Sequence, residues 1–304
     1  MRCLFHLLLL PLLAACAQTG IDCNLTKVVQ LPIEVQAHLL TVPVGINGKW
    51  TRLIVDSGAE RTTLSEAAAK RLDLTQDPHS VSHMTGIGGS YAHPDVLIDS
   101  MVISGVRFPI SRVPVSTLNF DRNAGLTADG LLGADILLAF EMDIDVPHNT
   151  LTLYRVRHCP GMRPNWPEPA VEVQGITSRK DRMLIPFTLD GLGGLAVLDT
   201  GAQGTVVGID MARRLGLTEA AMAADPMTRH RGAGPEIIQT HVHQFQALRI
   251  GPAVVTRPAL SVMPNPAGMG DALVGEDFLQ GRRVWLSCPT RQLFVSPVQQ
   301  EMPP

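Results

Sequence analysis

Short apolar and β-branched runs, each bounded by glycine, proline or asparagine, dominate the chain. Examples are Val96 to Val102, Leu151 to Val156 and Gln246 to Ile250. Runs of this length and composition predict β-strands. Apolar residues at helical spacing stand out in only two segments, Ser65 to Leu72 and Ile209 to Leu215. Ser65 before Glu66 is typical of a helix N-terminus. The pattern therefore predicts a mainly β protein with few, short helices.

This pattern occurs twice along the chain. An apolar strand ends immediately before Asp56, and a second one ends immediately before Asp199, 143 residues later. The turn signals Asn47-Gly48 and Asp190-Gly191 precede the two strands at the same offset and predict a hairpin in each half. A repeat of this length matches one small domain and is too long for a solenoid.

Further landmarks keep nearly the same offset over more than a hundred residues. Leu131-Leu132-Gly133 in the first half corresponds to Leu273-Val274-Gly275 in the second, 142 residues later. We therefore expect an internal duplication: two homologous lobes related by a pseudo-two-fold axis, with one short helix in each lobe.

The domain organisation follows from the repeat and from proline content. We expect lobe 1 over residues 31–158 and lobe 2 over residues 171–299. Residues 159–170 contain four prolines, which predict a stiff, extended linker. Residues 17–30 are interpreted as a polar tether, and residues 1–16 as a targeting signal.

The N-terminal segment has the pattern of a secretory signal. Arg2 precedes an apolar run from Leu4 to Leu13, which has the length of a signal core and is too short to span a bilayer. The end of the signal, Leu13-Ala14-Ala15-Cys16, resembles a bacterial lipobox, which implies lipidation of Cys16. We expect a periplasmic, lipid-anchored protein, with the outer membrane favoured by Ala17. The alternative is cleavage at Ala15-Cys16-Ala17, which would release a soluble secreted protein.

The cysteine content fits an oxidising compartment. Three of the five cysteines follow the signal, so at most one intramolecular disulfide can form among them. A bond between Cys23 and Cys159 would pin the N-terminal segment to lobe 1. Cys288 lies in a strand-like run and is interpreted as a buried free thiol.

Composition excludes some partners. The formal net charge is −3, and aromatic residues make up only 4% of the chain. There is neither a basic stripe for nucleic acid nor a set of stacking platforms for single strands. With 45% apolar residues, each lobe can bury a core of its own.

The repeated turns resemble those of the retropepsin-like aspartic proteases. In that family each lobe supplies an Asp-Ser/Thr-Gly-Ala turn after an apolar strand, and a later apolar-apolar-Gly segment packs beneath it. Here the turns are Asp56-Ser57-Gly58-Ala59 and Asp199-Thr200-Gly201-Ala202, above the two segments ending at Gly133 and Gly275. The resemblance covers nearly all of both lobes. Compact lobes and the alanine after each glycine favour this branch over the pepsin type.

The chemistry requires two carboxyl groups that share a site. Two adjacent carboxylates cannot both ionise easily, so such a pair holds one proton over a wide pH range. Asp56 and Asp199 are therefore the candidate catalytic pair, one activating water and the other acting as acid. Gly58 and Gly201 would allow close backbone approach. The hydroxyls of Ser57 and Thr200 are expected to reach the opposite lobe's backbone, and the small side chains of Ala59 and Ala202 to let the lobes nearly touch.

Glycine-rich segments lie between the helix and the later strands of each lobe, where the resemblance implies mobile hairpins, or flaps; their glycines would permit closure over a peptide substrate. The alternative is an ordinary glycine hairpin. The two tips differ in sequence, because Arg231 and Pro235 occur only on the second side. The candidate flap residues are Gly86, Ile87, Gly88 and Gly89 in lobe 1, and Gly232, Ala233 and Gly234 in lobe 2.

Other polar residues are interpreted as structural. Asp135 and Asp277 occupy equivalent positions and fit the first turn of a helix. His241 and His243 would share one face of a strand, which we interpret as solvated because no further ligand lies at metal-binding spacing. We expect no metal and no cofactor.

The sequence thus predicts an aspartic endopeptidase that acts on peptides or proteins as a monomer containing its own lobe–lobe interface. A catalytically inactive binding or scaffolding lipoprotein of the same fold is the alternative, although both turns are intact. Glycoside hydrolysis also uses two carboxylates, but these do not share a symmetric turn of small residues.

Overall fold

A computed structural model describes residues 24–117, 126–157, 159, 162–167, 169–173, 177–179, 182–232, 234–265, 270–287 and 290–298. The predicted hairpins are present in both halves. Asn47 and Gly48 have φ values of 49° and 76°, and Asp190 and Gly191 have values of 48° and 85°. Positive φ at both central residues is what a tight two-residue hairpin turn requires. These turns fix the strands that lead to Asp56 and Asp199.

Lobe 1 centres on an eight-stranded sheet. β3 (Leu39–Ile46) and β4 (Lys49–Val55) are antiparallel, and β12 (Gly130–Leu132) runs parallel to β4 on its other side. Further strands are β2 (Glu34–Gln36), β5 (Thr63–Ser65), β8 (Met101–Ile103), β9 (Val106–Phe108) and β11 (Val115–Ser116). A second, three-stranded sheet contains β6 (Gln76–Gly86), β7 (Gly89–Leu97) and β10 (Arg112–Val113).

Lobe 2 repeats this plan in a ten-stranded sheet. β17 (Arg182–Leu189) and β18 (Leu192–Leu198) form the equivalent hairpin, and β25 (Ala272–Val274) runs parallel to β18. The other strands are β16 (Thr177–Arg179), β19 (Val206–Gly208), β20 (Met227–Arg231), β21 (Ile237–Gln244), β22 (Ala247–Ile250), β23 (Ala253–Thr256) and β24 (Ala259–Met263).

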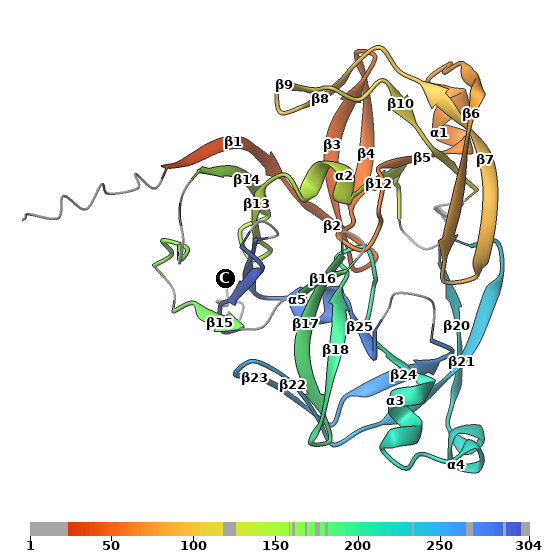
Figure 1. Cartoon of the computed structure of the whole chain (residues 1–304), viewed down its shortest axis with the longest axis vertical. Helices are drawn as coiled ribbons and strands as arrows, with labels where there is room; N and C mark the ends of the chain where they lie inside the picture. Colours follow the sequence, from red (N-terminus) through yellow and green to blue (C-terminus); the bar gives the residue numbers. More distant parts are fainter. Residues whose placement is uncertain are drawn as a thin grey trace, which may run out of the picture.

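Both lobes contribute to a six-stranded antiparallel sheet, which lies on the left in Figure 1. Its order is β1 (Asn24–Pro32), β14 (Thr150–Arg157), β13 (Glu141–Asp145), β26 (Arg283–Ser287), β27 (Gln292–Val295) and β15 (Val171–Val173). β13 and β26 join the lobes, with Asp143 opposite Trp285. Because these two residues are equivalent in the repeat, the pseudo-two-fold axis passes between them. One apolar core cluster extends through this sheet and includes buried residues of both lobes.

The helix in each lobe that the sequence predicts is present. α1 (Glu66–Arg71) is capped by Ser65, whose hydroxyl accepts a hydrogen bond from the Ala68 N–H, and α3 (Ile209–Arg214) is its counterpart. The expectation of one helix per lobe was too low. α2 (Ala134–Leu137), α4 (Glu219–Ala224) and α5 (Glu276–Leu279) are additional. α2 and α5 span one turn, which is too short to show a 3.6-residue period, and α4 buries only Met222.

Two sequence-based boundaries were wrong. The expected tether includes residues 24–30, which lie in β1 and pair with β14; alternate burial of Val29 and Leu31 explains the strand. The expected strand from Val96 to Val102 is interrupted after Leu97. There the Asn47 side chain accepts hydrogen bonds from the N–H groups of Asp99 and Ser100 at 2.8 and 3.0 Å and bends the chain.

Cys159 is buried and disulfide-bonded. Cys23, its expected partner, and Cys288 lie outside the described residues, as do residues 1–16, so the Cys23–Cys159 pairing stays a prediction. None of the helices in the described ranges has the length and apolar character needed to cross a membrane.

Candidate active site

The two repeated turns meet between the lobes. A Cβ atom added to Gly58 would lie 2.3 Å from Cγ of Asp199, and one added to Gly201 would lie 2.3 Å from Cγ of Asp56. Each glycine therefore makes room for the carboxyl group of the opposite lobe. The aspartates themselves are positioned by the parallel strands, because the Asp56 N–H donates to the Leu132 carbonyl at 3.0 Å and the Asp199 N–H to the Val274 carbonyl at 2.9 Å.

Hydroxyl groups cross between the lobes, as the sequence predicts. Ser57 Oγ donates to the Leu198 carbonyl at 2.7 Å, and Thr200 Oγ1 donates to the Val55 carbonyl at 2.6 Å. Each hydroxyl also accepts the backbone N–H of its counterpart, at 3.0 Å for Ser57 N and 3.1 Å for Thr200 N. All four bonds are buried, so water does not compete for them. They fix the two aspartates relative to each other.

The two carboxyl groups differ in their backbone contacts. Asp56 Oδ1 accepts from the N–H groups of Gly58 and Ala59 at 2.9 and 2.7 Å. Asp199 Oδ1 accepts from Gly201 at 2.9 Å, whereas the Ala202 N–H donates to the Asp199 carbonyl at 3.3 Å. Hydrogen bonds from N–H groups stabilise an ionised carboxylate. The turns are therefore related by symmetry but are not electrostatically equivalent.

Burial raises the pKa of both aspartates, and that of Asp199 rises much further. The carboxyl groups are hydrogen-bonded to each other, and the negative charge of Asp56 further disfavours ionisation of Asp199. The stronger backbone support of Asp56 lowers its pKa relative to that of its partner. Backbone hydrogen bonding therefore favours ionisation of Asp56 over ionisation of Asp199.

The expected flaps meet at their tips, on the side of the molecule away from the six-stranded sheet (Figure 1). In lobe 1 the hairpin β6–β7 turns at Ile87-Gly88, and in lobe 2 β20–β21 turns between Arg231 and Ile237. The Gly234 N–H donates to the Ile87 carbonyl at 2.8 Å, and the Glu236 N–H to the Gly88 carbonyl at 3.0 Å.

Glycine is needed where the tips touch. A Cβ atom on Gly234 would lie 2.1 Å from the Gly88 carbonyl carbon, and one on Gly232 would lie 2.5 Å from the Ile87 Cβ. Ile87 also packs against a lobe 2 cluster of Val206, Met263 and Leu273, which Ala202 joins. The lobe 1 tip thus contacts the region of the second aspartate turn. Ala233 lies outside the described residues.

Asp135 and Asp277 lie beside the turns and have structural contacts. Asp135 Oδ1 accepts from the N–H and hydroxyl of Thr62 at 2.8 and 2.7 Å, and Asp277 accepts from Thr205 at 3.0 and 2.8 Å. Asp135 therefore ties the segment after the first repeated turn to α2, and Asp277 ties the segment after the second to α5.

The interpretation of His241 and His243 as a solvated pair was wrong. Both are half-buried, and His243 Nδ1 lies 2.7 Å from the Asp225 carboxylate. Asp225 ends α4, which the sequence pattern did not predict, so its proximity to β21 was not apparent. Within the described ranges, no group of three or more metal-ligating side chains is found.

Two charged features near the turns were not singled out from the sequence. Arg182 in lobe 2 forms an ion pair with Glu60 of lobe 1 at 3.5 Å, and its positive charge lowers the pKa of both Asp56 and Asp199. Glu276 directly follows Gly275 and is 1% exposed, and its Oε2 has no partner among the described residues. Aligning the two halves at the 143-residue offset would have shown that Leu39 occupies the position in lobe 1 that Arg182 occupies in lobe 2.

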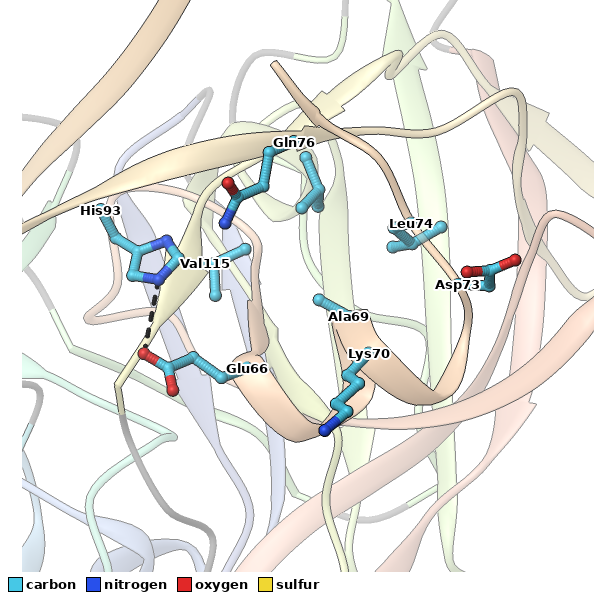
Figure 2. Close-up of a pocket in the computed structure, with 9 residues that line it drawn as sticks. Glu66, Ala69, Lys70, Asp73, Leu74, Gln76, His93 and Val115 are labelled. Carbon is cyan, nitrogen blue, oxygen red and sulfur yellow. Dashed lines mark ion pairs between the residues drawn. The ribbon is translucent and has the colours of Figure 1, made fainter. Parts of the chain in front are cut away.

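A pocket of about 460 Å³ lies elsewhere, between α1 and β7 of lobe 1 (Figure 2). Glu66 and His93 approach to 3.4 Å on its wall, and Lys70 and Gln76 also line it. Neither aspartate of the repeated turns contributes to it. The paired carboxyls, which have perturbed pKa values and fixed geometry, are the better candidate site.

The fold and the paired turns define the class of two-lobed aspartic proteases. In structural comparison the chain is similar to the aspartic proteinase from Irpex lacteus, with a TM-score of 0.55 and 12% sequence identity over 91% of this chain and 98% of that one. At this identity the similarity shows the fold alone.

Sequence comparison gives the family. The Aspartyl protease family matches residues 42–136 and 185–278, one match in each lobe and together more than half of the chain. This protein belongs to the aspartyl protease family and is of the retropepsin-like kind. It is also 29% identical over 140 residues to DNA damage-inducible protein 1 of Eremothecium gossypii; the match spans 45% of this chain and only 28% of that protein.

Proposed function

We propose that this protein is an aspartic endopeptidase in which Asp56 and Asp199 hydrolyse peptide bonds. The observation that carries the proposal is the close approach of the two carboxyl groups, each held by its own turn and seated against the glycine of the other. Two carboxyls that share one proton can supply a base and an acid at the same time. The intact glycines and hydroxyls on both sides support activity rather than a binding role alone.

The asymmetry of the pair suggests which residue has which role. Asp56, with two N–H donors, is ionised first and takes a proton from the attacking water. As the water oxygen bonds to the peptide carbonyl carbon, protonated Asp199 stabilises the oxyanion by a hydrogen bond. The C–N bond then breaks and the leaving amine receives a proton from the pair. No covalent enzyme intermediate forms.

We propose that the two hairpins cover an extended peptide during this reaction. The tip contacts would have to open for substrate to enter, and the hydrogen bonds of Gly234 and Glu236 are the contacts to break. Closure would exclude water and offer backbone groups to the peptide. The exposed edges of the hairpins suit main-chain recognition, which depends little on substrate sequence.

The test is cleavage of a diverse peptide library from about pH 3 to about pH 7. Asp56→Asn and Asp199→Asn should each reduce kcat/KM by at least about a thousandfold, because each removes one half of the acid–base pair. Asp210→Asn is the matched control, since its side chain is 63% exposed on α3. If folded wild-type protein cleaves no peptide at any pH, the endopeptidase proposal is wrong and the protein binds its partners without cleaving them.

We further propose that the protein works in the cell envelope as a lipid-anchored monomer on the periplasmic side, the outer membrane being favoured over the inner. The lipobox-like sequence ending at Cys16 supports the anchor. Incorporation of a labelled fatty acid that Cys16→Ser abolishes is the expected result, and release of unlabelled protein would favour the soluble alternative. The shared six-stranded sheet supports a monomer, which a solution mass measurement would check.

A further inference from the structure

The two lobes differ in charge beside the aspartate pair. Arg182 is the first residue of β17, and continuing the β17–β18 register two residues beyond the Leu184–Val197 pair places it across from Asp199. The equivalent residue of lobe 1 is Leu39, which is 5% exposed and belongs to an apolar cluster. A cation therefore stands next to one aspartate turn, while an aliphatic side chain takes its place beside the other.

The guanidinium group of Arg182 has hydrogen-bonding capacity left over. Its Nε is buried and has no partner within the described structure. Its contact with Glu60 is 3.5 Å long, and the Glu60 side chain is 55% exposed. A hydrogen bond of that length is weak, and a buried N–H without an acceptor is costly. The Arg182 side chain as a whole is 19% exposed, so an additional acceptor would reach its terminal guanidinium nitrogens rather than the enclosed Nε.

The other side of the pair offers no equivalent capacity. The counterpart of Glu60 is Gln203, whose Nε2 donates to the Ala37 carbonyl at 2.7 Å. This hydrogen bond also crosses between the lobes, but it joins two uncharged groups. Arg182, in contrast, lies across from Asp199 in the β17–β18 register and pairs with Glu60, which directly follows the Asp56 turn, so its positive charge lies beside the aspartate pair. The asymmetry therefore lies within reach of a peptide bound at the pair.

We infer that Arg182 is a specificity-determining residue that binds the carboxylate of an acidic side chain on one side of the scissile bond. The inference rests on the proposed endopeptidase function and names the substrate class: peptides with aspartate or glutamate at one defined position. The planar fork of an arginine matches a carboxylate in geometry as well as in charge. Because Leu39 occupies the equivalent place, the preference applies to one side only.

The experiment uses the mature protein and pairs of peptides that differ only by glutamate or glutamine at each position around the cleaved bond. For wild type, kcat/KM should favour glutamate at one position by at least about tenfold, as expected for a charge-assisted pair in a partly buried site. Arg182→Leu, which copies the lobe 1 residue, should bring that ratio to about 1. Arg213→Leu, in an exposed part of α3, should keep the wild-type ratio.

Glu60→Gln separates recognition from the lobe–lobe ion pair. Removing the competing carboxylate should preserve or increase the preference for glutamate. Loss of the glutamate preference in Glu60→Gln would show that Arg182 only ties the lobes together. An equal fall in kcat/KM for both peptides in Arg182→Leu, accompanied by a lower Tm, would show the same. Either result overturns the inference.

The inference and the proposed function fail in different ways. Cleavage with a ratio of about 1 at every position would overturn the assignment of Arg182 and leave the endopeptidase intact. Absence of any cleavage by folded wild-type protein would instead contradict the endopeptidase itself.

Discussion

Thr200 donates its hydroxyl hydrogen to the carbonyl of Val55 in the opposite lobe at 2.6 Å. The same oxygen accepts the Ser57 N–H, so one side chain satisfies two buried backbone groups of the other half. The position of each aspartate therefore depends on the partner lobe as much as on its own strand. A shift of one lobe would move both carboxyls apart.

Replacing Thr200 by valine tests this dependence. The variant keeps the shape of the side chain but leaves the Val55 carbonyl and the Ser57 N–H without partners, which should reduce the free energy of unfolding by about 1–3 kcal/mol. The catalytic activity of Thr200→Val should also fall, mainly through a lower kcat. Thermal unfolding and steady-state kinetics measure both effects. Thr256→Val, on an exposed position of β23, is the control. Equal losses of stability and activity in Thr200→Val and Thr256→Val would contradict this prediction.

The flap tips give a second prediction. Gly234→Ala places a methyl group against the Gly88 carbonyl carbon and should separate the tips. Because these contacts must open before a peptide enters, loss of two tip hydrogen bonds at about 1 kcal/mol each should favour the open form and predicts a fall in KM of up to about thirtyfold, with a smaller change in Tm.

Gly193→Ala is the matched control for this variant. Nothing lies within 4 Å of the added Cβ atom at Gly193, and the equivalent position of lobe 1 holds Trp50, which is 71% exposed. An unchanged KM for Gly234→Ala would show that the tips do not act on the substrate.

The charge of Arg182 predicts a change in pH dependence. Its positive charge lowers the pKa of Asp56 and of Asp199, so Arg182→Leu should raise both. The acidic limb of the pH–rate profile reports ionisation of the first aspartate, and the alkaline limb reports loss of the second proton. Both limbs should therefore move to higher pH. The profile of kcat/KM on a neutral peptide measures this; movement of the limbs to lower pH would be inconsistent with the geometry.

Glu276 predicts a dependence of stability on pH. Burial, and to a lesser extent the charge of Asp277, raises its pKa from about 4.5 to about 7. Between these values the folded state binds more protons than the unfolded state, so Glu276 lowers stability as pH rises through this range. Glu276→Gln cannot ionise and should lose less stability than wild type between about pH 5 and about pH 8.

Denaturant unfolding at both pH values measures this difference. Glu219→Gln is the control, since that side chain is 82% exposed. Parallel pH dependence of wild type and Glu276→Gln would contradict the prediction.

Much of the fold and of the candidate site was predictable because the relevant signals are local and repeated. A hairpin turn, an apolar strand and an acidic turn occur in sequence, and the second copy identifies the first as more than a chance turn. The paired carboxyls, the crossing hydroxyls of Ser57 and Thr200, and the helix beginning after Ser65 all follow from this pattern.

What the sequence did not predict depends on long-range pairing. β1 is mostly exposed and buries only Val29 and Leu31, so the strand depends on its pairing with β14 as well as on those two side chains. His243 meets Asp225 through α4, and Arg182 meets Glu60 across the two lobes. None of these contacts leaves a periodic signal, because each joins one residue to another that is distant in the chain.

The strands that join the lobes carry opposite chemistry. β13 presents Glu141, Asp143 and Asp145, whereas β26 presents Arg283, Trp285 and Ser287 at the facing positions. Arg283 binds Asp143 through two hydrogen bonds, and Trp285 and Ser287 donate to the buried Glu141 carboxylate. If lobe 1 paired with a second copy of itself in this register, three carboxylates would face three carboxylates. The halves are complementary and no longer interchangeable, so each has become an obligate partner of the other.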